Sequence, residues 1–345
     1  MRRNVGLVLT GAGAFFLAFA ALLRFYVADQ VIAAPANFFQ QSTLEATNAS
    51  YLDTATLKVR KGVHLRAVNT IRGDVRAASG KIAVWDSFTS IEDPATKKSV
   101  EIQQQRAAFD RRTGTLYNVR GASVGGDTSV RQSGVGLFWP IGVKKQTYQY
   151  FDLSTKRPWP ATFEGEERIH GVRAYRFVQR IPPTVTESVK GGVPAALLKV
   201  KKPKRLPGYD KKTGNVAADR VYDATVTLWV DPRTGGQVSQ EQRIRTVLRT
   251  RDGVDRLVAG DLDLKMTDAS QKSLVHVNKS QALKITLLRM VLPLGGAALG
   301  LVLLVVGLVL AIPGRQTIIP LPDAAEDDKT KADGLSSAAR PRSGG

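Results

Sequence analysis

The sequence contains no cysteine, and only three of its 345 residues are histidines: His64, His170 and His276. The absence of cysteine excludes disulfides, iron–sulfur clusters, thiolate metal sites and a cysteine nucleophile. The histidines lie far apart, and none belongs to an HxH or HExxH motif, so we expect no histidine-rich zinc site. The sequence therefore predicts neither a metal site nor a bound cofactor.

Acidic residues are also scarce, with 30 Asp and Glu against 50 Lys and Arg, which gives a formal net charge of +20. Such an excess favours anionic partners. The densest basic run is Lys199, Lys201, Lys202, Lys204 and Arg205. A solvated loop is the simpler explanation of this run. The functional alternative is contact with lipid headgroups or another anionic surface of the cell envelope.

Long uncharged apolar runs occur only near the two ends of the chain. Residues 5–23 form a run of 19, and residues 291–312 form a run of 22. As helices these runs would reach about 28–33 Å, which is enough to cross the hydrocarbon core of a bilayer. The sequence therefore predicts one transmembrane helix near each end.

The charged flanks of the two runs predict their orientation. Arg2 and Arg3 precede the first run and Arg315 follows the second. Basic residues in short flanks remain cytoplasmic. We therefore expect a two-pass protein of the plasma membrane with both termini inside, a large extracytoplasmic domain and no nucleic-acid partner. A cleaved signal peptide is the alternative for the first run, but the small-residue site at 34–36 lies well beyond the run and beyond Arg24.

The expected segments follow from this topology. They are a cytoplasmic N-terminus (1–4), a transmembrane helix (5–27), a β-rich extracytoplasmic domain (28–267), a stalk helix (268–290), a second transmembrane helix (291–312) and a disordered cytoplasmic tail (313–345).

Small residues mark a packing face in each run. The second run contains Gly296 and Gly300 in a GxxxG motif, with Gly307 beyond, and the first contains Ala14 and Ala18 at four-residue spacing. Small residues allow helix backbones to approach closely in lipid. Two alternatives remain open: the two helices pack on each other, or one of them forms a homo-oligomer or binds another membrane protein.

The middle of the chain has the composition of a β domain. Short segments rich in β-branched and aromatic residues occur at 57–60, 80–86, 147–152, 172–178 and 224–230. Turn sequences at 110–114, 152–156 and 231–236 separate strands, and no βαβ rhythm is present. We expect a mainly β (α+β) fold, with a curved antiparallel sheet closed as a sandwich or barrel between the two terminal transmembrane helices. Asp268 and Gln271 resemble a capping box that starts the stalk helix.

Candidate catalytic motifs are weak. Residues 121–125 match the G-x-S-x-G pattern around Ser123, but loop composition follows where a nucleophile elbow requires a helix. Glu164, Glu166 and Glu167 crowd one stretch, and exposed charges on a strand explain them more simply than acid–base catalysis. We therefore expect a protein that is not an enzyme.

Four tryptophans offer a different kind of site. They are Trp85, Trp139, Trp159 and Trp229. Aromatic side chains of this kind either fill a core or line an apolar cavity.

Two segments carry a resemblance to a known family. Residues 165–177 read GEERIHGVRAYRF and residues 228–235 read LWVDPRTG. Together with the two terminal runs, they resemble actinobacterial membrane proteins labelled as a PorA-type porin family or as a domain of unknown function. The resemblance covers residues 1 to about 315 and implies an envelope membrane protein without catalytic residues. In architecture alone, the chain is similar to class B scavenger receptors, whose ectodomain holds a lipid tunnel.

These observations lead to two functional hypotheses. The first is an envelope protein whose β domain binds or passes a lipid or another apolar component, with the basic run at an anionic surface. The alternative is a non-catalytic scaffold or accessory subunit of a membrane complex. A channel would require several chains, because two helices cannot enclose a pore.

Overall fold

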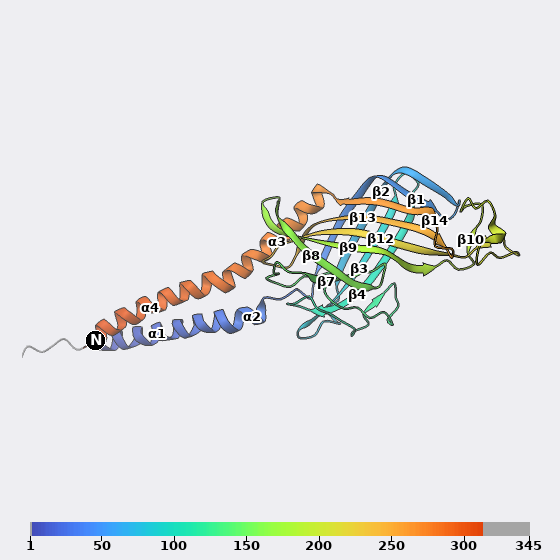
Figure 1. Ribbon diagram of the computed structural model, residues 1–345. Coiled ribbons are helices and arrows are strands. Elements are labelled where there is room, and N and C mark those ends of the chain that lie inside the picture. The colour runs from blue at the N-terminus through green and yellow to red at the C-terminus, as the bar shows by residue number, and fades with distance from the viewer. Residues whose placement is uncertain (1, 313–345) are drawn as a thin grey trace, which may run out of the picture.

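The computed structural model describes residues 2–312. Figure 1 shows two long helical segments side by side at one end of the molecule and a curled sheet at the other. The first segment joins α1 (Arg2–Leu22), the π-helix η1 (Leu23–Val27) and α2 (Ala28–Val31). The second joins α3 (Asp268–Thr286), the π-helix η3 (Leu287–Val291) and α4 (Leu292–Ala311). By length and composition, Arg2–Val27 and Asp268–Ala311 are each suited to crossing a membrane. The tail expected at 313–345 lies outside the described residues.

The residues between the helices form one large antiparallel sheet and a small one. In the large sheet the strands follow the order β5-β4-β3-β2-β1-β14-β13-β12-β9-β8-β7, and β6 pairs with β4. Its strands are β1 (Phe39–Asp53), β2 (Lys58–Gly73), β3 (Ile82–Asp93), β4 (Lys98–Asp110), β5 (Leu116–Tyr117), β6 (Ser123–Val124), β7 (Tyr148–Asp152), β8 (Arg157–Ile169), β9 (Val172–Ser188), β12 (Ala218–Val230), β13 (Gln237–Thr250) and β14 (Asp255–Met266). The small sheet pairs β10 (Val193–Pro194) with β11 (Asn215–Val216). The expected mainly β fold with a curved antiparallel sheet between terminal helices is confirmed.

The two edges of the large sheet meet at the segment around Val135. The Val135 amide donates to the Gln149 carbonyl at 2.7 Å, and the Phe151 amide donates to the Val135 carbonyl at 2.8 Å, beside β7. On the other side, the Leu116 amide of β5 donates to the Gly134 carbonyl at 2.8 Å. The half-barrel is therefore linked across its open side by one irregular segment, which gives partners to both edge strands.

Within the described residues, the sequence Asp-X-X-Thr forms six turns. They begin at Asp53, Asp93, Asp110, Asp152, Asp210 and Asp231. The Asp carboxylate accepts amide hydrogens two or three residues ahead, as Asp53 does from Ala55 at 3.0 Å. The residue after the Thr has a positive φ in every case. At Gly114 and Gly235 a Cβ would also collide with the backbone of Phe138 and Trp139, so only glycine suits both positions.

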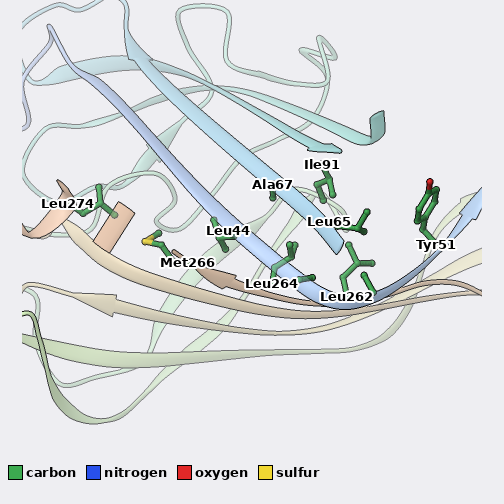
Figure 2. Close-up of a cluster of buried hydrophobic side chains, with 11 residues drawn as sticks. Leu44, Tyr51, Leu65, Ala67, Ile91, Leu262, Leu264, Met266 and Leu274 are labelled. Atoms are coloured by element: carbon green, nitrogen blue, oxygen red, sulfur yellow. The ribbon is translucent and has the colours of Figure 1, made fainter. Parts of the chain in front are cut away.

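A continuous apolar core lies on the concave side of β1, β2 and β14. Figure 2 shows Leu274 of α3 and Met266 at one end of this core and Tyr51 at the other. Leu65 is fully buried and Leu264 nearly so. Because α3 inserts Leu274 among these side chains, the second helical segment is attached to the sheet by burial of apolar surface.

The stalk helix starts one residue earlier than the capping-box pattern indicates. Thr267 is the N-cap, and its hydroxyl accepts from the Ser270 amide at 3.3 Å. The Gln271 side chain is instead directed to Ser239 Oγ on β13, at 3.1 Å. The prediction that Asp268 and Gln271 form the cap is therefore wrong, because Gln271 connects the helix to the sheet.

An ion pair between the buried Asp53 and the half-exposed Lys98 lies at one hairpin end and predicts a pH dependence of stability. Lys98 Nζ lies 2.9 Å from Asp53 Oδ2. This hydrogen bond lowers the pKa of Asp53 from 3.8 to about 2. Because the folded pKa lies below the unfolded one, the carboxylate contributes stability above about pH 4, and this contribution is lost as the pH falls toward 2.

We therefore expect Asp53→Asn to lower the melting temperature at neutral pH and to lose most of this difference from wild type by about pH 2.5. Circular dichroism of the detergent-solubilised full-length chain measures both melting curves. A difference that stays constant across this pH range would contradict the assignment.

Candidate ligand cavity

The concave side of the sheet encloses a cavity of about 310 Å³. Sites for small molecules span roughly 300–1,000 Å³, so this cavity falls at the lower end of their range. Strands contribute to its wall at alternate positions, as β3 does with Trp85, Ser87, Thr89 and Ile91. This period of two is expected, because successive side chains of a strand point to opposite faces.

Much of the wall consists of uncharged polar side chains. They include Gln40, Ser42, Asn69, Ser87, Thr89, Gln103, Gln105, Gln179, Gln240 and Gln242. Several bond to one another: Asn69 Nδ2 donates to Ser87 Oγ at 2.9 Å and to Thr89 Oγ1 at 2.7 Å. Within residues 2–312, Asp152 and Lys284 are the lining residues with an acidic or basic side chain. The wall thus offers many hydrogen bonds and little charge.

The apolar mouth of the cavity lies where the helices enter the sheet domain. Val31 and Ile32 line it from the end of the first helical segment, and Val277, Ile285 and Leu288 line it from the second. Val31 is 58 % exposed and Val277 is 38 % exposed. The cavity therefore opens between two apolar helix surfaces.

A group of ionisable side chains lies at the other end of the cavity, around Asp152. Burial raises the pKa of the Asp152 carboxyl. It also raises the pKa of the Tyr150 phenol to about 12, and that of Tyr222 in the same direction. Tyr222 Oη lies 3.4 Å from Asp152 Oδ2, and Thr155 donates its amide and its hydroxyl to Asp152 Oδ1, each at 2.6 Å. Both phenols therefore stay neutral at physiological pH and act as hydrogen-bonding groups.

Close backbone contact joins the two helical segments. A Cβ on Gly13 would lie 2.5 Å from the Leu304 amide nitrogen and 2.7 Å from the Gly300 carbonyl oxygen. A Cβ on Gly307 would lie 2.8 Å from the Gly6 carbonyl oxygen. The antiparallel helices therefore touch at glycines, a contact that any side chain would prevent.

The small residues of the first helix divide between two faces. Gly6, Gly13 and Ala20 are buried against the second helix, whereas Ala14 and Ala18 are exposed. Of the glycines singled out in the second helix, Gly300 and Gly307 are buried, and Gly296 faces Ala20. Ala14 and Ala18 therefore lie on a face of the first helix that does not contact the second helix.

The sequence profile described as Porin PorA matches residues 5–309. The chain belongs to the Porin PorA family. A protein named Porin PorA from Corynebacterium resistens is 22 % identical over 407 aligned positions, which cover 92 % of this chain and 98 % of that relative. A second Porin PorA, from Corynebacterium amycolatum, is 29 % identical over 119 positions, which cover 30 % of each chain.

Membership of the Porin PorA family confirms the resemblance carried by residues 165–177 and 228–235. These segments lie on β8–β9 and on β12 with the turn that follows. The turn after β12 also contacts the loop that contains Trp139, because the Trp139 amide donates to the Gly235 carbonyl at 3.3 Å. The segments that carry the resemblance are thus structural parts of the sheet domain.

The basic run of this PorA-family chain lies far from its helices. Lys199, Lys201, Lys202, Lys204 and Arg205 surround the short 3-10 helix η2 (Pro203–Arg205), beside β10. In Figure 1 this region forms the end of the sheet domain opposite the helical segments. All five side chains belong to exposed residues, and none forms an ion pair with another described residue. We call this region the basic tip.

The motifs considered for catalysis have structural surroundings. Ser123 lies in the two-residue strand β6 and is followed by a turn at Asp127. Glu164 pairs with Arg180, Glu166 with Lys145 and Arg173, and Glu167 with Arg176. Within residues 2–312 no group of three or more His, Asp or Glu side chains is placed to hold a metal ion.

The tryptophans divide between the two roles expected for them. Trp85 lines the cavity and stacks on Phe38, with ring centroids 4.1 Å apart. Trp139 and Trp229 belong to buried clusters. Trp159 lies under Arg157, with 4.2 Å between the guanidinium carbon and the ring centroid.

Sequence reasoning missed the cavity amides, because Gln103, Gln104 and Gln105 follow one another on β4 and show no alternation of apolar and polar residues.

The helix contact can be tested directly, because the chain has no cysteine of its own. A Cβ on Gly296 would lie 3.6 Å from the Ala20 Cβ, a separation that suits a disulfide. We expect the double variant Ala20→Cys/Gly296→Cys to form an intramolecular disulfide on mild oxidation in membranes. Non-reducing electrophoresis and protection from alkylation detect it.

The matched control is Ala14→Cys/Gly296→Cys, which places one thiol on the exposed face and should stay reduced within the chain. Cross-linked dimers of the first variant, in place of an internal disulfide, would show that the helices pair between chains.

Proposed function

We propose that this chain is a two-pass membrane protein of the cell envelope whose curled sheet binds or passes a lipid or another apolar envelope component. One observation carries the proposal. The mouth of the cavity is built from the helix ends that adjoin the apolar spans, including Val31, Ile285 and Leu288. With the spans in a bilayer, the mouth faces the membrane surface, so the path of a lipid chain into the cavity is short.

The charges at the helix ends support this placement. Arg24 and Arg289 lie in the two π-helices, which contact each other between the spans and the sheet domain. There their long stems can reach the headgroup layer. Arg2 and Arg3 at the opposite end favour a cytoplasmic N-terminus. Both termini then lie inside the cell, and the sheet domain lies outside, away from nucleic acid.

The relatives are named porins, and this name suggests a channel. The outer face of β13 and β14 carries Glu241, Arg243 and Arg245 opposite Lys265, Asp263 and Asp261. A charged ladder of this kind is unfavourable against lipid, which speaks against the half-barrel itself crossing the membrane. The helix pair has its glycines in backbone contact and leaves no lumen between them. A non-enzymatic lipid-handling role fits both features better than a pore within one chain.

The alternative is a scaffold or accessory subunit. It is favoured by one observation: Ala14 and Ala18 form an exposed small-residue face on α1 that the helix pair does not use. A membrane-protein partner or a second copy of the chain can approach there. A cross-linked dimer formed by the control variant Ala14→Cys/Gly296→Cys would favour this alternative.

The basic tip fits an anionic partner away from the anchoring membrane. Because it lies at the end of the sheet domain opposite the helices, we propose that it contacts an anionic polymer of the envelope rather than the headgroups around the two spans.

Filling the cavity tests lipid binding. Ser87 lines the cavity and is 6 % exposed, so Ser87→Trp should displace a bound chain. We expect native mass spectrometry of the full-length protein to find copurified lipid on the wild type and at least about tenfold less on the variant. Ser99→Trp on the exposed side of β4 is the matched control. A wild type free of lipid would refute the proposal.

Neutralising the basic tip tests the second contact. We expect replacement of its five basic residues by serine to lower the salt concentration at which the protein elutes from an immobilised anionic polysaccharide, because fewer ion pairs hold it. The control replaces five exposed basic residues elsewhere by serine, namely Lys61, Arg76, Lys81, Arg131 and Lys144. Equal elution shifts would mean that net charge, not the tip, governs binding.

A further inference from the structure

Gln179 on β9 is a fully buried side chain with one unused polar atom in the cavity wall. It is 0 % exposed and lines the cavity. Its Nε2 donates to the Tyr150 carbonyl at 2.6 Å and to the Trp159 carbonyl at 3.2 Å. Since both amide hydrogens face carbonyl oxygens, the orientation of the amide is fixed by its partners.

The other atom of this amide, Oε1, is buried and has no hydrogen-bond partner among the described residues. A buried carbonyl oxygen without a donor is unfavourable, and native structures supply a donor to nearly all such atoms. The group that would pair with Oε1 is a hydrogen-bond donor, and the cavity that Gln179 lines is the space from which such a group can approach.

The position of Gln179 along the cavity can be read from the strand register. Gln271 of α3 bonds to Ser239, which pairs with Trp229 on β12. Gln179 pairs with Val226, three residues further along that strand, and Tyr222 lies seven residues along. At about 3.3 Å per residue, Gln179 lies roughly 10 Å beyond the helix contact and Tyr222 roughly 23 Å beyond it. The orphan oxygen therefore belongs to the inner cavity, past the apolar mouth.

The chemistry of the inner cavity excludes an anionic headgroup. Lys284, the lining cation, lies on the exposed side of α3 at the mouth. Deeper in, the ionisable carboxyl is Asp152, and the remaining polar groups are amides, hydroxyls and phenols such as Gln103 and Tyr222. A phosphate there would find no cationic side chain among the lining residues other than Lys284 at the mouth, whereas a group with several hydroxyls could donate to carbonyl oxygens and accept from amide and phenol hydrogens.

From these observations we infer that the preferred ligand is a lipid with a neutral, hydroxyl-rich headgroup, a sugar or polyol, and that one of its hydroxyls donates to Gln179 Oε1. The headgroup occupies the inner cavity, and the chains leave through the apolar mouth between α2 and α3. This inference rests on the proposed lipid-binding function and specifies its ligand class.

Three lipids with the same oleoyl chains test the inference on the full-length protein in a sugar-free detergent: dioleoyl glucosyl glycerol, dioleoylglycerol and dioleoyl phosphatidylglycerol. Native mass spectrometry gives the bound fraction at each concentration. We expect the glucosyl lipid to bind about tenfold more tightly than either other lipid, because it alone combines several hydroxyl donors with an uncharged headgroup.

Gln179→Met keeps the size of the side chain and removes the acceptor, so it should abolish most of the preference for the glucosyl lipid while dioleoylglycerol still binds. Gln149→Met, on the exposed side of β7, is the matched control and should bind as wild type does. Melting curves establish that the variants fold. If Gln179→Met does not fold, the ranking of the three lipids on the unaltered chain still tests the headgroup inference.

The outcomes separate the two proposals. Equal binding of all three lipids, or tightest binding of the phosphatidylglycerol, overturns the headgroup inference and leaves lipid binding intact. An unaltered preference in Gln179→Met overturns the role of Gln179. Binding of none of the three lipids overturns the proposed function itself.

Discussion

The backbone contact between the two helices fixes the geometry of the molecule. Small residues recur every seventh position, at Gly6, Gly13 and Ala20 in the first helix and at Gly300 and Gly307 in the second. Each glycine admits the opposite backbone to a distance that a Cβ would prevent, so sliding one helix by a residue would place side chains where there is no room. The register of the helix pair fixes the positions of α2 and α3 along the axis of the pair. The width of the cavity mouth between those helix ends is therefore determined within the apolar spans.

The sheet domain combines two interiors that differ in chemistry. Beside β1, β2 and β14 the concave face is closely packed with Leu65, Leu264 and their neighbours, and Leu274 anchors α3 there. Elsewhere the same face presents amides and hydroxyls around empty space. A polar interior weakens the hydrophobic stabilisation of a sheet, so other interactions must stabilise its curvature. Three features do so: the link at Val135, the aromatic cluster around Trp85 and Phe109, and the six Asp-X-X-Thr turns.

The same polar interior explains what the sequence could and could not reveal. Segments such as 172–178 and 224–230 alternate apolar and polar residues and were recognised as strands, and the two terminal helices follow from hydrophobicity alone. Strands β1 and β4 escaped notice because their inward positions hold residues such as Gln40, Ser42 and Gln105, which remove the alternation that sequence analysis relies on. The helix-packing face was sought at four-residue spacing, at Ala14 and Ala18, whereas the actual contact follows a seven-residue period. The cavity depends on how distant strands curl together, and no local pattern encodes it.

For the proposed lipid-binding role, the difference between holding a ligand and passing it on lies in a partition at the inner end of the cavity. A second hollow of about 480 Å³ lies on the outer side of that end and shares Gln103, Leu153, Ser154 and Tyr222 with the cavity. The partition between the two is held by long contacts: Gln103 Nε2 lies 3.4 Å from Ser154 Oγ, and Arg220 lies 3.4 Å from Glu101 beside it. Contacts of this length are weaker than ladder hydrogen bonds, so these two contacts resist displacement of the partition side chains only a little. A headgroup bound near Gln179 would lie on the mouth side of that partition, with its chains still directed toward the helices. Release in that direction would deliver the ligand headgroup first, away from the membrane, which suits a carrier more than a pore.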